Sequence, residues 1–180
     1  KDAYRIRPEN WSSSHNLHSL LAARKCLQSH ITKYPESCFL LAEPASILAY
    51  GILPQAIRNR ARVQLVFHGS EIARWSAPSL ARFFAKKAAV SAFNITAVST
   101  KIADAAKCAF PAAAHKTISI PNALPSNLDP KMTQKRGESG TFNLLSVGRI
   151  HPRKGFDQVI QAIGKLDNRL KTKIHYTIIG

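Results

Sequence analysis

Short apolar runs alternate along the chain with segments of helical pattern. Runs without polar alternation, typical of buried parallel strands, cover residues 38–42, 63–67, 95–98, 116–120, 142–147 and 174–179. Helical spacing or helix-favouring composition lies between them, over residues 17–31, 45–52, 78–92, 99–109 and 156–166. Serines at 12–14 and Ser99 provide N-caps for two of these helices. The alternation predicts an α/β fold built on a Rossmann-like parallel sheet.

The composition changes between residues 122 and 140, where Pro, Ser, Asn and Gly are frequent and apolar residues are few. Such a stretch is typical of a linker. It divides the chain into a Rossmann-like domain over 1–121, a linker over 122–140 and the start of a second Rossmann-like domain over 141–180. Forty residues of βαβ pattern cannot bury both faces of a sheet. We therefore expect a fragment, with the first domain incomplete at its N-terminus and the second truncated.

The charge is strongly positive. The 180 residues include 26 Lys and Arg against 10 Asp and Glu, a formal net charge of +16. This balance favours a polyanionic partner such as nucleic acid, anionic lipid or a phosphorylated small molecule, or else a merely solvated cationic surface. The basic residues form no run typical of a nucleic-acid arm. No apolar run approaches the roughly 18 residues of a membrane-spanning helix.

The three cysteines are far apart in the sequence and lack the spacing of a metal site. We expect a reducing, cytoplasmic compartment and no disulfide. Cys38 begins an apolar run, so we expect it to be a small core residue. The seven histidines show no metal-ligand spacing either.

The loop between residues 148 and 155 carries the clearest chemistry, because it joins a predicted strand to the start of a predicted helix. Arg149 offers a planar fork for phosphate oxygens, and Lys154 offers a point charge on a long stem. Gly148 allows a sharp turn, and Gly155 leaves the helix N-terminus uncrowded. The loop is predicted to bind a diphosphate. The alternative is a solvated basic turn.

Residues 146–166 resemble the start of the donor domain in family-4 glycosyltransferases, whose motif is a Gly-Arg pair, a short spacer and a Lys-Gly pair. Four residues separate Arg149 from Lys154, as in that motif. Three earlier segments, each at the end of a predicted strand, occur in the family's order. They are His68-Gly69-Ser70-Glu71, Ala97-Val98-Ser99 and Ile118-Ser119-Ile120-Pro121-Asn122. The family usually has Gly after the Pro-Asn pair, where this chain has Ala123.

The resemblance implies a two-domain GT-B fold and a retaining transfer from a UDP- or GDP-sugar to a saccharide or lipid-linked acceptor. It implies a place in polysaccharide, lipopolysaccharide or glycolipid biosynthesis of the cell envelope, with no metal cofactor and no nucleic acid. Arg149, Lys154 and Gly148 would hold the donor diphosphate. His68 would act at the catalytic centre, with Gly69 and Glu71 on the acceptor side. The family's paired-glutamate motif does not occur in residues 1–180, so we expect this piece alone to be inactive.

Two alternatives remain open at this stage. His68 is also explained as an ordinary histidine at a strand end, hydrogen-bonded to backbone. A different class of function is a non-catalytic basic α/β module that binds nucleic acid with steep salt dependence.

The helix expected over 78–92 mixes cations with aromatic residues, which is typical of helices that lie on an anionic membrane. Its cations are Arg82, Lys86 and Lys87. Peripheral association with the inner face of the cytoplasmic membrane is one interpretation. The other is that Leu80, Phe83 and Phe84 pack on the sheet.

Overall fold

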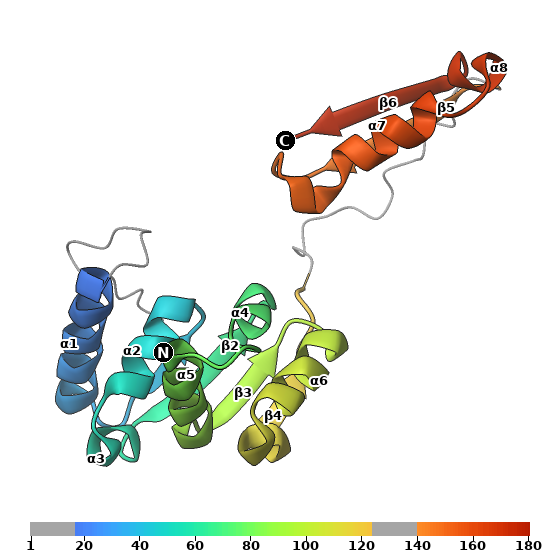
Figure 1. Cartoon of the computed structure of the whole chain (residues 1–180). Helices are drawn as coiled ribbons and strands as arrows, with labels where there is room; N and C mark the ends of the chain where they lie inside the picture. Colours follow the sequence, from blue (N-terminus) through green and yellow to red (C-terminus); the bar gives the residue numbers. More distant parts are fainter. Residues whose placement is uncertain (1–16, 124–139) are drawn as a thin grey trace. The chain divides into compact units, whose positions relative to one another are not determined.

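The computed structural model describes residues 17–123 and 140–180, which belong to two compact units (Figure 1). Unit 1 spans Lys1–Leu124 and unit 2 spans Pro125–Gly180. The serine caps predicted at 12–14 and all but the ends of the predicted linker lie outside the described residues.

Unit 1 is built on a four-stranded parallel sheet. Its strands lie in the order β1 (Cys38–Leu41), β2 (Arg62–Phe67), β3 (Asn94–Ala97) and β4 (Thr117–Ser119). Leu41 pairs with Leu65, and Leu65 pairs with Ile95. The predicted α/β fold with a Rossmann-like parallel sheet is therefore confirmed.

The predicted helices of unit 1 are present within a few residues of their expected ends. Longer helices are α1 (Leu17–Lys33), α2 (Pro44–Ile52), α5 (Leu80–Ser91) and α6 (Thr100–Ala109). Short helices that the sequence pattern missed are α3 (Gln55–Arg58), α4 (Ser70–Arg74) and the 3-10 helix η1 (Pro111–Lys116). Ser99 caps α6 as predicted, since its hydroxyl accepts a hydrogen bond from the Ile102 N–H at 3.3 Å.

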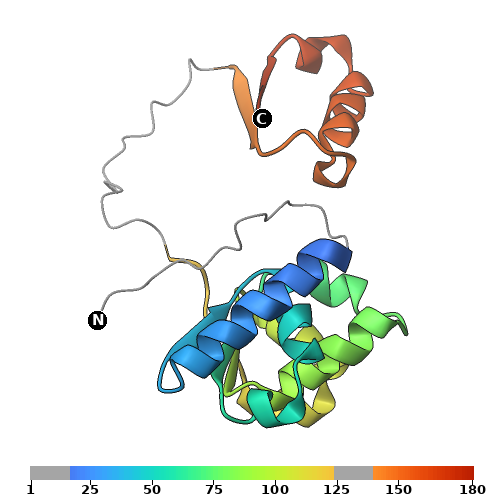
Figure 2. The same cartoon turned by 90° about the vertical axis from the view of Figure 1, so that its left-hand side faces the viewer.

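The core lies on one face of the sheet. Each strand is followed in the sheet by the next strand of the chain, and right-handed connections in one direction place their helices on the same side of the sheet. Figure 2 shows the helices on one side of the sheet. The strand side chains that face them are buried, namely Phe39, Leu41, Val63, Leu65, Phe67, Ile95 and Ala97.

The opposite face of this sheet is exposed on its two edge strands, β1 and β4. Leu40 is 64% exposed, Ile118 is 45% exposed, and Cys38 is exposed. The prediction that residues 38–42 are buried on both faces is therefore wrong, and Cys38 is not a core residue. The physical reason is that alternate strand residues point to opposite faces, and only one face has helices over it.

Small residues set the packing of α5. Ala85, Ala88 and Ala89 are its buried residues. A Cβ atom at Gly51 of α2 would lie 2.1 Å from the carbonyl oxygen of Phe84, so the two helices approach closely because Gly51 has no side chain. Leu80 and Phe83 lie on the outer side of α5 instead. The prediction that these two side chains pack on the sheet is wrong.

A buried arginine, Arg58, forms hydrogen bonds at the C-terminal ends of helices α2 and α5. Arg58 donates hydrogen bonds to the carbonyl groups of Gly51, at 3.3 Å, and Leu53, and to the Ser91 hydroxyl at 3.1 Å. The Tyr50 hydroxyl donates to the Arg58 carbonyl at 3.1 Å. Burial raises the pKa of Tyr50 to about 12. Arg58 therefore stabilises the fold, and its guanidinium is used within unit 1.

Unit 2 is a two-stranded parallel sheet with helices on one side. It contains β5 (Phe142–Val147), the 3-10 helix η2 (Pro152–Lys154), α7 (Phe156–Gly164), α8 (Asn168–Lys171) and β6 (Ile174–Ile179). Both predicted strands and the predicted helix are present. None of its described residues is buried, however, so the expected burial of its strands is not found within residues 140–180.

Candidate functional site

The cationic loop of unit 2 begins where β5 ends. Gly148 has a φ of +153°, and its N–H donates to the Ile179 carbonyl at 2.8 Å, which ties the loop to the end of β6. Gly155 has a φ of +68° and forms the N-cap of α7. Both glycines occupy conformations that residues with a Cβ rarely adopt, so glycine is required at each end of the loop.

A short 3-10 helix shapes the middle of the loop. Pro152 is its first residue, and the His151 ring nitrogen Nδ1 accepts a hydrogen bond from the Arg153 N–H at 3.2 Å. The Lys154 N–H donates to the His151 carbonyl at 2.8 Å. The sequence pattern described this segment as irregular and missed the capping role of His151.

Lys154 folds back toward the start of the loop. An ideal Cβ atom at Gly148 would lie 3.6 Å from Lys154 Cε and 3.9 Å from Lys154 Nζ. The ammonium group therefore lies beside the backbone of Gly148, at the carboxyl end of β5. This is the edge of a parallel sheet where ligands bind.

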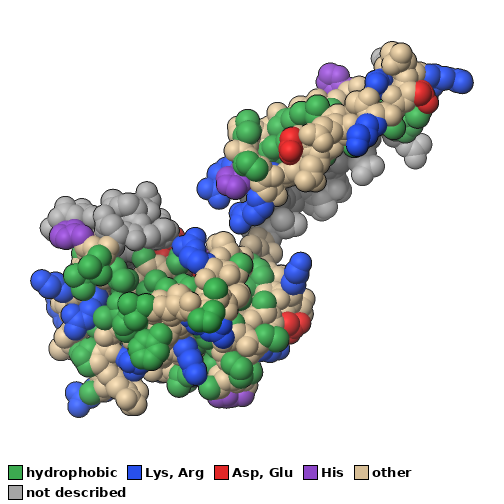
Figure 3. Space-filling view, in the orientation of Figure 1, with side chains coloured by type: hydrophobic (Ala, Val, Ile, Leu, Met, Phe, Trp, Pro, Cys, Tyr) green, Lys and Arg blue, Asp and Glu red, His purple; other side chains and the backbone are tan. Residues whose placement is uncertain are grey.

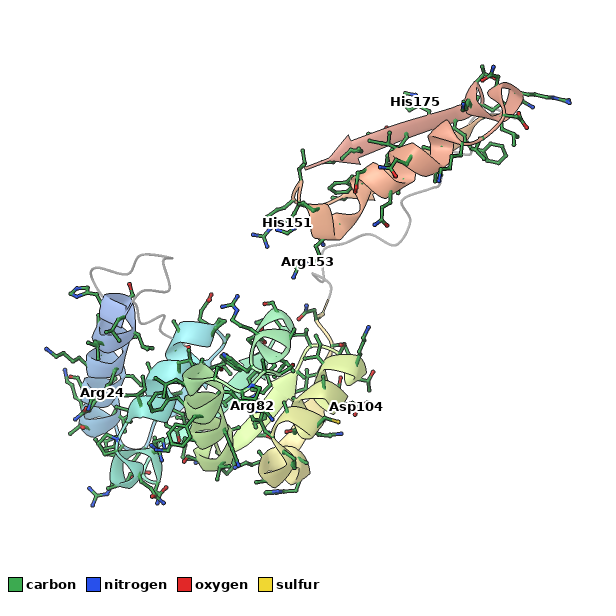
Figure 4. The ribbon with its side chains drawn as sticks, in the orientation of Figure 1. Arg24, Arg82, Asp104, His151, Arg153 and His175 are labelled. Carbon is green, nitrogen blue, oxygen red and sulfur yellow. The ribbon has the colours of Figure 1, made fainter. Side chains whose placement is uncertain are left out.

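The cations of this loop are exposed and unneutralised within the described chain. Arg149, Arg153 and Lys154 are all exposed. The ion pair that the structure records among described residues, Lys107 with Asp104, belongs to unit 1. Figure 4 shows His151 and Arg153 at the end of unit 2 that carries the loop. Three guanidinium or ammonium groups without carboxylate partners suit a multiply charged anion.

A groove of about 530 Å³ runs between α7 and the sheet of unit 2. Its lining residues are Leu144, Lys154, Gly155, Gln158, Val159, Ala162, Ile163, Leu166 and Ile174. Most of these side chains are apolar, and Lys154 is the single charged residue among them. The groove therefore adds apolar surface beside the loop, and Lys154 belongs to both.

The second predicted group of site residues follows β2 in unit 1. Gly69 has a φ of +113°, and a Cβ atom there would lie 2.9 Å from Ile102 Cδ1. The turn therefore packs against α6 and needs glycine for both its conformation and its space. His68, just before it, is exposed at the carboxyl end of β2.

The buried Glu71 carboxylate forms hydrogen bonds with residues of this turn. It is 2% exposed, and its Oε1 atom accepts hydrogen bonds from the N–H groups of His68 and of Gly69, the latter at 3.0 Å. Its Oε2 atom accepts from the Ser70 hydroxyl at 3.2 Å. The structure thus gives Glu71 a positioning role, in which its carboxylate is used within the turn. A ligand would meet His68 rather than Glu71.

The His68 imidazole has no hydrogen-bond partner among the described residues. The hydrogen bond from its ring to the backbone that the alternative interpretation expects is not seen within residues 17–123 and 140–180. Glu43, which the sequence reasoning missed, leaves the same sheet edge from β1 and is exposed, with no capping hydrogen bond from its side chain. The feature that could have identified it is an acidic residue directly after a predicted apolar strand.

Over residues 17–123 and 140–180, no three His, Cys, Asp or Glu side chains gather in a way that could hold a metal ion. In the same part of the chain, no helix has the length and apolar character needed to cross a membrane. The two groups of predicted site residues lie in different units, with Gly148, Arg149 and Lys154 in unit 2 and His68, Gly69 and Glu71 in unit 1.

Comparison of the chain with protein-family models finds no match, and comparison with curated protein sequences finds none either.

Proposed function

We propose that the protein is a retaining glycosyltransferase of the GT-B type that takes its sugar from a nucleotide-sugar. The observation that carries the proposal is the fold of the 148–155 loop. Two glycines in conformations that favour glycine bracket three exposed cations, and Lys154 Nζ lies against Gly148 at the carboxyl end of β5. The resemblance of residues 146–166 to the donor domain of family-4 glycosyltransferases supports the same assignment.

In this proposal, the bond between the anomeric carbon and a phosphate oxygen of the donor breaks. A bond from the acceptor hydroxyl oxygen forms with retention, and the hydroxyl proton passes to the departing phosphate. Negative charge increases on the diphosphate as the bond breaks. Arg149 would contact two phosphate oxygens at once, and Lys154 would offset the growing charge as a point cation.

His68 supplies the acceptor side of the proposed reaction. Its exposed imidazole can donate to or accept from an acceptor hydroxyl, and Glu71 fixes the backbone from which it projects. The packing of Gly69 against Ile102 further limits movement of this turn. His68 is therefore proposed as an orienting residue, with Glu71 acting through it.

The proposal extends to location and substrates. A net charge of +16 suits acceptors of the cell envelope that are attached to anionic lipid, and we place the enzyme in the cytoplasm at the inner face of the membrane. The donor would be a UDP- or GDP-sugar. The reaction as proposed uses no metal ion and no nucleic acid.

The test is a transfer assay with labelled UDP- and GDP-sugars, using the complete gene product. Replacing Arg149 or Lys154 by Ala should lower kcat/KM about 100-fold, as expected when a contact to developing charge is lost. Lys165→Ala, an exposed lysine just after α7, is the matched control and should leave the rate unchanged. Rates within twofold of wild type for both loop variants would contradict the proposal. Steeply salt-dependent nucleic-acid binding with no response to nucleotide-sugars would favour the nucleic-acid module instead.

A further inference from the structure

The outer face of α5 is apolar where a helix that covers a sheet is normally polar. Leu80 is 71% exposed, Phe83 is 51% exposed and Val90 is 47% exposed. Together with Lys87, they are spaced three, four and three residues apart, so the four side chains form one stripe along the helix. Ala85, Ala88 and Ala89 fill the opposite, buried side. This outer stripe is called the α5 stripe below.

Cations surround the α5 stripe, and acidic residues are absent from this part of the sequence. No Asp or Glu occurs between Glu71 and Ser99, whereas four Lys or Arg residues do: Arg74, Arg82, Lys86 and Lys87. The helices that the structure packs most extensively against α5 within the described residues are α2 and η1, and neither contains an acidic residue. Figure 3 shows hydrophobic side chains interspersed with Lys and Arg over α2 and α5.

Two side chains of the α5 stripe, Phe83 and Lys87, contact each other. The Lys87 ammonium lies 4.3 Å from the centre of the Phe83 ring, and the Phe83 and Phe84 rings are 5.4 Å apart. The Arg82 guanidinium donates to the Ser76 carbonyl, and Figure 4 labels this residue on α5. The lysine stem is long enough for its charge to reach lipid headgroups while the ring enters the acyl region.

We propose that the α5 stripe is a docking surface for an anionic phospholipid bilayer. Exposed aliphatic and aromatic side chains gain by leaving water, and the flanking lysines gain by approaching lipid phosphates. A second copy of the chain is a poor occupant, because two molecules of charge +16 repel. Nucleic acid is a poor occupant too, since Leu80 and Val90 offer nothing to a phosphate backbone. The proposal does not depend on transferase activity.

The experiment is sedimentation of the whole chain with vesicles of phosphatidylglycerol and phosphatidylcholine, compared with vesicles of phosphatidylcholine alone. The wild-type chain should sediment with the anionic vesicles and stay in the supernatant when only neutral vesicles are present. Replacing Lys86 and Lys87 together by Gln should weaken binding about 25-fold, because each lysine near an anionic surface strengthens binding about fivefold. Phe83→Ser should weaken it about tenfold through lost apolar burial. All three side chains are exposed, so these variants should keep the wild-type melting temperature.

Two matched controls use residues elsewhere on the surface. The double variant Lys101→Gln with Lys165→Gln removes two positive charges, as the Lys86 and Lys87 variant does. Leu17→Ser removes an apolar side chain of α1 that is 70% exposed. Both should bind nearly as wild type does. Equal binding to neutral vesicles, no binding to either kind, or an equal loss in the controls would overturn the proposal. A dimer in solution that Phe83→Ser dissociates would also overturn it, in favour of a second copy as the occupant.

Discussion

Replacement of Glu71 by Ala should loosen the turn that presents His68. The carboxylate accepts two backbone N–H groups, from His68 and Gly69, and also the Ser70 hydroxyl. Removing the acceptor of a buried N–H group costs about 1–3 kcal/mol. With two such groups in a partly buried turn that water can reach, the loss in unfolding free energy should be about 2–4 kcal/mol. At about 4 °C per kcal/mol for a domain of this size, Tm should fall by about 10 °C.

The assay is thermal unfolding followed by circular dichroism. Glu71→Gln keeps a neutral acceptor and should lose about half as much, because hydrogen bonds to a charged group are about twice as strong as neutral ones. Glu43→Ala is the matched control, since that carboxylate is exposed and makes no capping hydrogen bond. Its effect should stay within about 0.5 kcal/mol. A wild-type Tm for Glu71→Ala would refute the argument that this carboxylate holds the turn.

Two further predictions concern Gly51 and Tyr50 of helix α2 in unit 1. Gly51→Ala should lower the free energy of unfolding by about 1–3 kcal/mol, because the new Cβ would clash with the Phe84 carbonyl. Gly164→Ala, in α7 of unit 2, has open space around it and should be neutral or slightly stabilising. Thermal unfolding of both variants measures the difference. The pKa of Tyr50 is raised to about 12 from 10.0, so its contribution to stability should be intact below pH 10 and lost as the pH rises toward 12. Tyrosinate absorbance and denaturant unfolding across that range would detect it, and ionisation of every tyrosine near pH 10 would contradict it.

The sequence was sufficient for the order of strands and longer helices, because each has a local physical cause. Apolar runs mark β1 to β6, and the Ser99 hydroxyl begins α6 where the cap was expected. The short helices were missed because their causes are not periodic patterns. Helix α4 follows a turn that the Glu71 side chain holds, and η2 depends on the His151 ring and on Pro152.

The burial of individual residues could not be predicted in the same way. Cys38 and Leu40 read as core residues, yet the helices of unit 1 cover only the other face of the sheet. Phe83 reads as a packing residue, yet the close approach of α5 to Gly51 selects alanines for the interface. Burial depends on which elements meet across the chain, and a local apolar pattern does not contain that information.

The candidate site was predicted in part. Gly148 and Gly155 have the special backbone conformations that a tight cationic loop requires, and Gly69 does too. The inward orientation of Glu71 was not predictable, because it depends on backbone N–H groups that the turn brings to one carboxylate. The sequence identified Glu71 as a candidate site residue, but it did not indicate that its carboxylate bonds to the backbone of the turn.

Whether the loop from Gly148 to Gly155 binds a diphosphate can be measured by a nuclear magnetic resonance titration of the isotope-labelled chain with UDP and GDP. The amide resonances of this loop should shift on addition of either nucleotide, and much less with the parent nucleosides. Lys154→Ala should weaken binding about tenfold or more, as expected for a lost charged hydrogen bond, while Lys165→Ala should not. Shifts confined to other segments, or equal responses from the two lysine variants, would contradict diphosphate binding by this loop.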